Sequence, residues 1–450
     1  MKSQAYNPQR SRWIGKLTLS AAFALLTATL GTTARAQLTS TREGQPSQDL
    51  LSVSAIASNN HLFNVFCIDN IHENANGVPI VITCNDKFSW IGLDQTTRAG
   101  GPQVSAFSPL ASIDDAFGYR VFYADSAQNL NQMLPAQGLV APPTNTHLGV
   151  QTWGGISAYS ANGEFTLAST VFERVFYETS DQHVHMLVSS NGGSFADEDL
   201  TRFTGGTLAR RGSDFTSFHD GSGEHAFYFG ANQHLYQIYG SWISYYICNP
   251  ITRTCGTVSY IKWSNQDLTG TNGPLVGASL TSFSDATGEY VFYVGQDVHL
   301  HELSYGGTGW ADQDLTIDAP AILPFSASGI TGLTSLTNPL GRQVFFIGND
   351  LNVHQIVLSS SGGIDTNLTT HANGPMVNPC FGLQLTSFTR TLDNLNQRES
   401  DVFYTATDGT IHRLSQVGTE FLLFGGRPMW LVGGWTDVDI PFSVIDRCIQ

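Results

Sequence analysis

The hydrophobic and polar positions of this chain repeat with a long period. An aromatic residue pair, usually within the tripeptide Val-Phe-Tyr, recurs seven times at intervals of 51 to 65 residues. The seven phenylalanines of this pattern are Phe66, Phe122, Phe176, Phe227, Phe292, Phe345 and Phe403. A period near 50 with strand-like content indicates one supersecondary unit that is repeated around a ring or along a line. Since one unit cannot bury its own hydrophobic face, we expect neighbouring units to stack on one another.

Each unit is predicted to contain four strands. In the fifth unit, segments 281–283, 288–295, 297–303 and 310–316 alternate apolar and polar residues, which is the period of a half-buried strand. Short stretches rich in Gly and Asp separate these segments, and such compositions favour tight turns. Four strands joined by tight turns form one small antiparallel sheet.

The fold class that follows is all-β: a seven-bladed β-propeller with four-stranded antiparallel blades. A linear β-solenoid is the alternative, but its strands run parallel, whereas short Gly-rich turns require antiparallel hairpins. The ring can close in two ways. Either Gln48–Leu50, which resembles the fourth strand, pairs into the last blade, or Trp435–Ile440 completes that blade alone.

The first 36 residues have the pattern of a secretory signal. A basic start is followed by the apolar run 17–30 and by the small-residue site Ala34-Arg35-Ala36. The apolar run is too short to span a bilayer, so a retained membrane anchor is the less favoured alternative. We expect residues 37–450 to form a single propeller domain that is secreted or periplasmic and does not insert into a membrane.

The chain is acidic, with 37 Asp and Glu residues against 21 Lys and Arg residues. Five of the basic residues lie in the predicted signal segment, so its removal leaves the domain still more negative. Such a surface repels nucleic acid and anionic lipid, and neither is expected as a partner. The alternative is that the acidity serves solubility alone. Nothing in the sequence calls for a cofactor.

Six cysteines, all beyond the signal segment, predict disulfides because the count is even and the protein is expected to be exported. Proximity in sequence suggests three pairs: Cys67 with Cys84, Cys248 with Cys255, and Cys380 with Cys448. The middle pair lies in an insertion of the fourth unit, where a disulfide would replace the packing that a long loop lacks.

Two units carry a complete His-x-His motif, His183/His185 and His299/His301. Residues i and i+2 of a strand lie on one face, so two imidazoles could ligate zinc or copper there. The motif recurs at one place in each unit, however, and no third ligand is evident. We favour a repeated polar bridge between blades and predict no metal site.

Four tryptophans share one position in the predicted fourth strand: Trp90, Trp263, Trp310 and Trp435. An exposed indole there would be a platform for the apolar face of a sugar. The alternative is packing between blades, and Phe195 and Ile364 at the same position are typical of packing.

The order of an aromatic strand, a short turn, a His/Glu-Leu strand, Gly-Gly and Trp resembles the fucose-binding lectin propellers, which include six-bladed fungal and seven-bladed bacterial forms. The resemblance covers residues 50 to 445 at the level of pattern. It implies an Arg before the aromatic strand and a Glu twelve residues later that together hold sugar hydroxyls beside an aromatic platform. The corresponding pairs, expected to face each other across a hairpin, are Arg120 with Gln132, Arg174 with Met186, His225 with Gln237, Tyr290 with Glu302, Gln343 with Gln355, and Asp401 with Arg413.

No blade therefore keeps Arg and Glu together, and Arg120 with Gln132 is the nearest match. The sequence predicts a carbohydrate-binding protein without catalysis, with glycan sites between blades and fucose-like sugars as candidate ligands. The candidate binding residues are Arg120, Gln132, Arg174, Glu302, Trp90, Trp263, Trp310 and Trp435. A glycan-processing enzyme is one alternative. The other is a protein-interaction scaffold that uses the Cys248–Cys255 loop. Sugar identity and oligomeric state stay open.

Overall fold

The computed structural model describes residues 52–440 with internal gaps, of which the longest are 81–88, 135–142, 163–170 and 317–331. All described residues belong to one compact unit, Ser47–Gln450. The predicted signal segment and Gln48–Leu50 lie outside the described residues, as do the side chains of the strands before residue 95.

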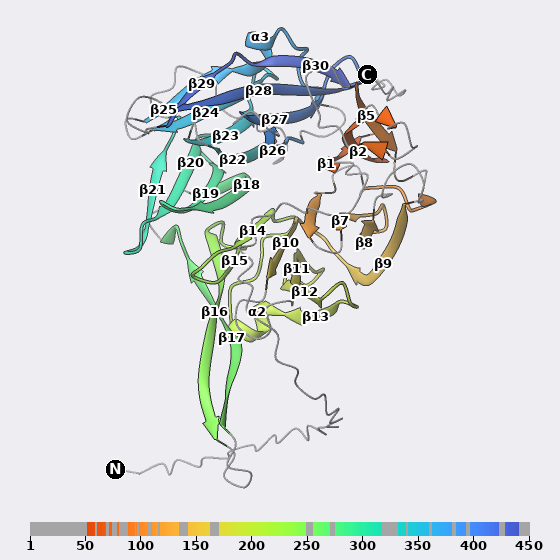
Figure 1. Cartoon of the computed structure of the whole chain (residues 1–450). Helices are drawn as coiled ribbons and strands as arrows, with labels where there is room; N and C mark the ends of the chain where they lie inside the picture. Colours follow the sequence, from red (N-terminus) through yellow and green to blue (C-terminus); the bar gives the residue numbers. More distant parts are fainter. Residues whose placement is uncertain are drawn as a thin grey trace, which may run out of the picture. The chain divides into compact units, whose positions relative to one another are not determined.

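Antiparallel β-sheets dominate the described residues, and each corresponds to one sequence repeat (Figure 1). The first sheet contains β1 (Ser52–Ser58), β2 (His61–Ile68) and β5 (Ser89–Asp94), with a separate pair β3 (His72–Glu73) and β4 (Pro79–Ile80). The second sheet contains β6 (Ala111–Asp115), β7 (Gly118–Ala124), β8 (Asn129–Leu134) and β9 (Thr144–Gln151). The third contains β10 (Ile156–Asn162), β11 (Val171–Glu178), β12 (Val184–Ser190) and β13 (Ala196–Asp199), followed by helix α2 (Leu200–Thr204).

The remaining sheets follow the same order along the chain. The fourth sheet contains β14 (Phe215–His219), β15 (Glu224–Phe229), β16 (Leu235–Cys248) and β17 (Cys255–Asp267). The fifth contains β18 (Val276–Asp285), β19 (Gly288–Gly295), β20 (Leu300–Tyr305) and β21 (Trp310–Asp314). The sixth contains β22 (Leu333–Asn338), β23 (Gly341–Ile347), β24 (Val353–Ser359) and β25 (Gly362–Asn367), followed by α3 (Leu368–Ala372). The seventh contains β26 (Thr386–Leu392), β27 (Gln397–Thr405), β28 (Ile411–Leu422), β29 (Pro428–Val432) and β30 (Thr436–Ile440).

The Val-Phe-Tyr tripeptide lies in the second strand of each sheet, and in the second to seventh sheets it is buried on both faces. In β11, Phe176 packs in a core shared with the fourth sheet, whereas Val175 and Tyr177 pack in a core shared with the second sheet. Successive side chains of a strand point to opposite faces, so one tripeptide supplies two interfaces. The repeat therefore contains three consecutive large apolar residues because the core lies between sheets and not within one.

A ladder of hydroxyl pairs joins the first strands of neighbouring sheets and explains the recurrent Thr-Ser dipeptide. The hydroxyl of Thr281 in the fifth sheet lies 2.9 Å from that of Ser335 in the sixth. Equivalent pairs at 2.7 to 2.8 Å are Ser157 with Ser217, Thr216 with Ser282, and Thr334 with Ser387. Polar groups on these partly buried first strands are thus satisfied by the next sheet.

Contacts between first strands run in sequence order from β6 through β10, β14, β18 and β22 to β26, and β26 also contacts β1 of the first sheet. This is the arrangement of a β-propeller, as predicted. The seven sheets agree with the seven repeats, while a closed ring of seven blades stays a prediction. In the seventh sheet, β30 pairs with β28. Since Gln48–Leu50 lies outside the described residues, the choice between the two closure hypotheses stays a prediction.

The hairpin of β16 and β17 continues past the other strands of its sheet (Figure 1). Its two strands pair from Tyr236 with Asp267 to Cys248 with Cys255, whereas β15 pairs only as far as Gly240. The predicted Cys248–Cys255 disulfide is present and closes the end of this ribbon. The other two predicted pairs, Cys67 with Cys84 and Cys380 with Cys448, lie outside the described residues and side chains.

Candidate functional site

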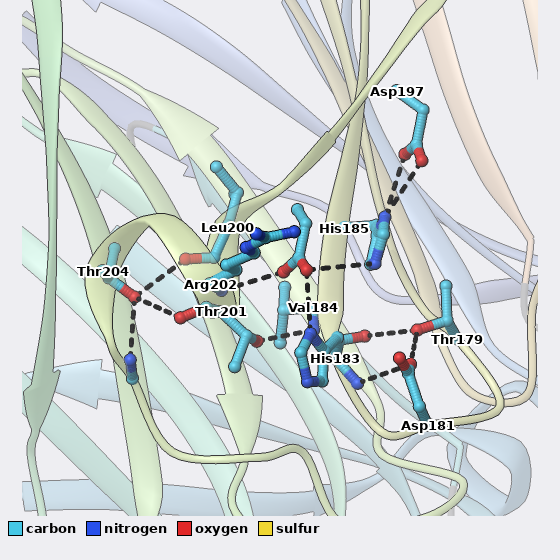
Figure 2. A network of polar contacts seen from close by, with 12 residues as sticks. Thr179, Asp181, His183, Val184, His185, Asp197, Leu200, Thr201, Arg202 and Thr204 are labelled. Atoms are coloured by element: carbon cyan, nitrogen blue, oxygen red, sulfur yellow. Dashed lines mark hydrogen bonds and ion pairs between the residues drawn. The ribbon is translucent and has the colours of Figure 1, made fainter. Parts of the chain in front are cut away.

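A repeated hydrogen-bonded clip joins the third and fourth strands of the sheets, and Figure 2 shows it in the third sheet. The hydroxyl of Thr201 accepts a hydrogen bond from the backbone N–H of Val184 at 2.8 Å. The equivalent threonines are Thr269, Thr316 and Thr369, which accept from Leu235, Leu300 and Val353. Asp199 also caps α2 by accepting from the N–H of Arg202 at 2.9 Å. The recurrent Asp-Leu-Thr is therefore a strand-ending clip.

The histidines of the His-x-His motif bond carboxylates of their own sheet. In the third sheet, His183 Nδ1 lies 2.9 Å from Asp199, and His185 Nδ1 lies 3.1 Å from Asp197. Both carboxylates come from β13, next to β12. The predicted polar bridge between blades is thus wrong in its location. Adjacent strands are about 4.8 Å apart, so an imidazole reaches the neighbouring strand before it reaches another sheet.

In the sixth and seventh sheets, the motif holds one buried histidine between two carboxylates. His354 lies 3.1 Å from Asp365 and 3.2 Å from Asp350, and His412 lies 2.8 Å from Asp437 and 2.9 Å from Asp408. Burial alone would lower the pKa of each histidine. The hydrogen bonds and charges of the paired aspartates outweigh burial, so both pKa values are raised above 6.5.

This arrangement predicts a stability that falls as pH rises. The folded-state pKa exceeds the unfolded-state value, so the stabilisation is fully present below about pH 6.5 and is lost as pH rises through the folded-state pKa. We expect the free energy of unfolding, measured by urea denaturation, to decrease as pH rises above about 6.5, the reference pKa of histidine. The variant His354→Asn/His412→Asn should show a smaller decrease. Asparagine occupies the equivalent position in the second sheet, as Asn131. An unchanged pH dependence in this variant would contradict the assignment.

The interfaces between sheets contain ion pairs, and two of the predicted binding residues lie in them. Arg174 of the third sheet bonds both carboxylate oxygens of Glu224 in the fourth, at 2.9 and 3.2 Å, and Tyr159 donates to the same carboxylate at 2.8 Å. Arg120 of the second sheet pairs with Glu173 of the third, and both side chains are buried. Gln132 is also buried. At these two interfaces, the protein's own carboxylates contact the guanidinium groups.

The interface between the fifth and sixth sheets is more open. Glu302 Oε1 accepts from Arg342 Nη1 at 3.1 Å, and 24% of the Arg342 side chain is exposed. The Arg342 guanidinium lies 4.0 Å above the ring of Tyr290. Glu302 Oε2 is buried and has no hydrogen-bond partner among the described residues. Burial raises the pKa of Glu302, and Arg342 offsets part of that rise. An acidic acceptor, a guanidinium donor and an aromatic ring therefore meet here.

Sequence reasoning missed Arg342. The pattern of the family places an Arg in the same hairpin as Glu302. The arginine that pairs with Glu302 comes instead from the next repeat, 40 residues later. The expected facing pairs also shift by two residues, since Gln132, Met186 and Glu302 lie opposite Phe122, Phe176 and Phe292. Side chains still reach across the diagonal in three sheets. The bonded pairs are His225 with Gln237 at 2.8 Å, Gln343 with Gln355 at 2.9 Å, and Asp401 with Arg413 at 2.7 Å.

The tryptophans of the fourth strand pack against the Phe of the preceding sheet. Trp310 meets Phe227 edge to face, with ring centroids 5.8 Å apart, and Trp435 meets Phe345 at 5.9 Å. Trp263 meets Phe176 at 6.5 Å, and Phe195 fills the same role against Phe122. Trp435 is buried, while Trp263 and Trp310 are half-buried. The backbone of Trp90 pairs with Cys67, and its side chain lies outside the description. Trp263, Trp310 and Trp435 therefore all pack between sheets.

Two further features bear on the alternative hypotheses. Glu178 accepts from the N–H of Ser213 at 3.1 Å, and burial raises the pKa of its carboxyl to about 7, a value suited to a general acid. The ribbon of β16 and β17 exposes Tyr245, Tyr246 and Ile247, which are apolar contacts of the kind that a scaffold offers. No helix among the described residues is long and apolar enough to cross a membrane.

Comparison with known proteins finds similarity in structure alone. No protein-family model matches the chain, and no curated protein matches it. A fucose-specific lectin from Aleuria aurantia is 14% identical with a TM-score of 0.42, and the match covers 76% of this chain and 99% of the lectin. AofleA from Arthrobotrys oligospora is 14% identical with a TM-score of 0.43, covering 75% and 90%. A GH43_1 enzyme from Xanthomonas citri, solved with xylose, is 9% identical with a TM-score of 0.31, covering 58% and 90%. The described sheets make this chain an all-β propeller, and it resembles fucose-binding lectins, as the sequence pattern predicts.

Proposed function

We propose that this protein binds carbohydrate, without catalysis, at the interface between the fifth and sixth sheets. The observation that carries the proposal is the meeting of Glu302, Arg342 and Tyr290. Glu302 presents a buried oxygen with no partner among the described residues, and Arg342 is the partly exposed cation beside it. Buried acceptors are normally satisfied, so an unpaired one at an accessible interface favours a ligand that donates.

Neighbouring sugar hydroxyls suit this pair of groups. One hydroxyl can donate to the free Glu302 oxygen, and the next can accept from an Arg342 N–H, since Arg has five donors and uses one on Glu302. Hydrogen bonds to charged groups are the stronger class. Tyr290 holds the guanidinium in place by lying beneath it.

The equivalent interfaces favour a structural role for the other arginines. Arg174 donates two N–H groups to the buried carboxylate of Glu224, and Arg120 is buried against Glu173. We therefore propose that Arg120 and Arg174, with Trp435, stabilise the fold, and that Glu302 belongs to the binding site. Trp263 and Trp310 are only partly buried, so part of each side chain stays open to a ligand at its own interface. The signal-like residues 1–36 and the Cys248–Cys255 disulfide support export of a single domain, residues 37–450.

Glycan binding is testable with the mature protein on a glycan array that includes fucosides, because the neighbouring lectins bind them. We expect Arg342→Ala and Glu302→Gln each to weaken binding by about tenfold to hundredfold, the effect of losing one charged hydrogen bond of about 1.5–3 kcal/mol. Arg202→Ala, at an exposed arginine of α2, is the control and should leave binding unchanged.

Two results would contradict the proposal. One is an array on which the mature protein binds no glycan, and the other is full affinity in both variants. The enzymatic alternative is followed in the same samples by release of reducing sugar from bound glycans. Release that disappears in Glu178→Gln would favour hydrolysis over simple binding.

A further inference from the structure

The third and fifth sheets differ from the others in one cluster of side chains. In each, the turn before the third strand provides an Asp, the His-x-His motif spans the start of that strand, and the fourth strand ends in Asp. The two sets are Asp181, His183, His185 and Asp199 in the third sheet, and Asp297, His299, His301 and Asp314 in the fifth. The turn that precedes the strand supplies the third ligand that the sequence motif by itself did not reveal.

The atoms of these groups lie close together. In the third sheet, one ligand atom each of Asp181, His183 and His185 lies within 4.8 Å of the others. Asp199 Oδ2 lies 2.9 Å from His183 Nδ1 and 4.0 Å from His185 Nε2. Figure 2 shows His183 and His185 side by side, with Asp181 below His183 and Asp197 above His185. Both imidazoles are partly exposed, so an ion can reach them from solvent.

The fifth sheet has the same residue types at the equivalent positions, but its close group consists of two aspartates and one histidine. Ligand atoms of Asp297, His299 and Asp314 lie within 4.8 Å of one another. His299 Nδ1 is 2.6 Å from Asp314, and His301 Nε2 is 3.2 Å from Asp297. The same four residue types therefore occur at equivalent positions of two sheets, with ligand atoms of three of them close together in each.

A second layer of contacts orients one histidine in each cluster. Asp197 bonds His185 Nδ1 and accepts from the hydroxyl of Tyr177 at 2.7 Å, which leaves His185 Nε2 on the side of the cluster. In the fifth sheet, Asp312 bonds His301 Nδ1 and accepts from Tyr293 at 2.8 Å. A carboxylate on the distal nitrogen is how proteins commonly orient a histidine that ligates a metal.

We propose that each cluster binds one divalent transition-metal ion, and Zn²⁺ is the ion that we expect. Two neutral imidazoles and two carboxylates form a four-ligand set that suits zinc. Copper(II) and nickel(II) can bind the same ligands and would compete with zinc. The ligand atoms of a tetrahedral zinc site are about 3.3 Å apart, so the separations of up to 4.8 Å must shorten. Asp181 and Asp297 lie on exposed turns and have room to move.

The charge of each cluster favours a cation. With neutral imidazoles, Asp181, Asp197 and Asp199 place three negative charges around two rings, and Asp297, Asp312 and Asp314 do the same. The remaining sheets lack part of the set. The fourth has Asn232 and Tyr236 beside His234, the sixth has Asn352 and Asn367 around His354, and the seventh has Thr410 before His412. These positions supply natural substitutes for the variants below.

The test is zinc titration of the full-length, untagged protein by isothermal calorimetry after removal of metal with EDTA, at neutral pH. We expect two zinc ions per chain. His183→Asn and His299→Asn, which introduce the residue found at this position in the sixth sheet, should each reduce the number to one. The double variant should bind none. Cobalt(II) in place of zinc should give a visible absorption band that disappears in the double variant.

His234→Asn is the matched control, because it changes a single histidine at the same position of the fourth sheet and should leave two ions bound. The double variant loses the hydrogen bonds of His183 with Asp199 and of His299 with Asp314, so it should melt at a somewhat lower temperature in EDTA. A transition that stays cooperative separates loss of ligands from loss of fold. Zero zinc bound by the unaltered protein, or two ions still bound by the double variant, would overturn the proposal. Glycan binding is measured separately and does not enter this result.

Discussion

Replacing Arg174 with methionine is expected to destabilise the protein by about 3–5 kcal/mol, because the substitution leaves the buried carboxylate of Glu224 without its cation. Arg174 supplies two of the hydrogen bonds that Glu224 receives across the interface between the third and fourth sheets. Among the residues that the structure describes, the Tyr159 hydroxyl would be the remaining donor to that carboxylate. The free energy of unfolding, obtained from urea denaturation at neutral pH, measures the loss.

The double variant Arg174→Met/Glu224→Gln separates the cost of the orphaned charge from the value of the pair. Since the neutral amide costs less to bury than an unpaired carboxylate, the double variant should be more stable than Arg174→Met alone. Arg202→Met, at an exposed position, should change stability by no more than about 0.5 kcal/mol. A loss below about 1 kcal/mol in Arg174→Met would show that this ion pair does not hold the two sheets together.

Replacing Trp435 with alanine is the second large effect that we expect, again a loss of about 3–5 kcal/mol. The Trp435 ring is 6% exposed, meets Phe345 of the sixth sheet edge to face and donates from Nε1 to Gln355 at 3.2 Å. Alanine would leave a cavity between the sixth and seventh sheets and an unpaired Gln355 acceptor.

Trp435→Phe is the matched control, because the third sheet already uses Phe195 at this position against Phe122. The phenylalanine variant should lose less than half as much stability as the alanine variant. If Trp435→Ala instead kept its stability and lost only glycan binding, the tryptophan would be a sugar platform and the packing assignment would be wrong.

The sequence determined the repeating unit and its strands. The recurrent tripeptide fixes where the second strand lies, because a strand buried on both faces needs consecutive large apolar residues. The Asp-Leu-Thr phrase marks the end of the fourth strand, since its threonine is the acceptor for a backbone N–H of the strand beside it. The Cys248–Cys255 pair also follows from sequence, because the two residues are close together within one insertion of the fourth repeat. All of these are local relations.

Contacts between repeats were decided by the tertiary structure alone. Glu302 meets Arg342, Arg174 meets Glu224, and Trp435 meets Phe345, and each pair joins two different sheets. The pattern within one repeat gives the strand on which a side chain lies, but the partner depends on how far the next sheet is rotated and shifted. The strand register also differs by two residues from the expected one, a difference that only backbone pairing reveals.

The ligand sets illustrate the same division. Spacing showed that two histidines lie on one face of a strand, since side chains alternate along it. It did not show that a turn Asp folds back onto them or that a neighbouring strand orients one ring, because those contacts depend on the path of the chain after the turn. Residues that are neighbours along the chain were therefore predictable from the sequence, and residues brought together by the packing of sheets were not.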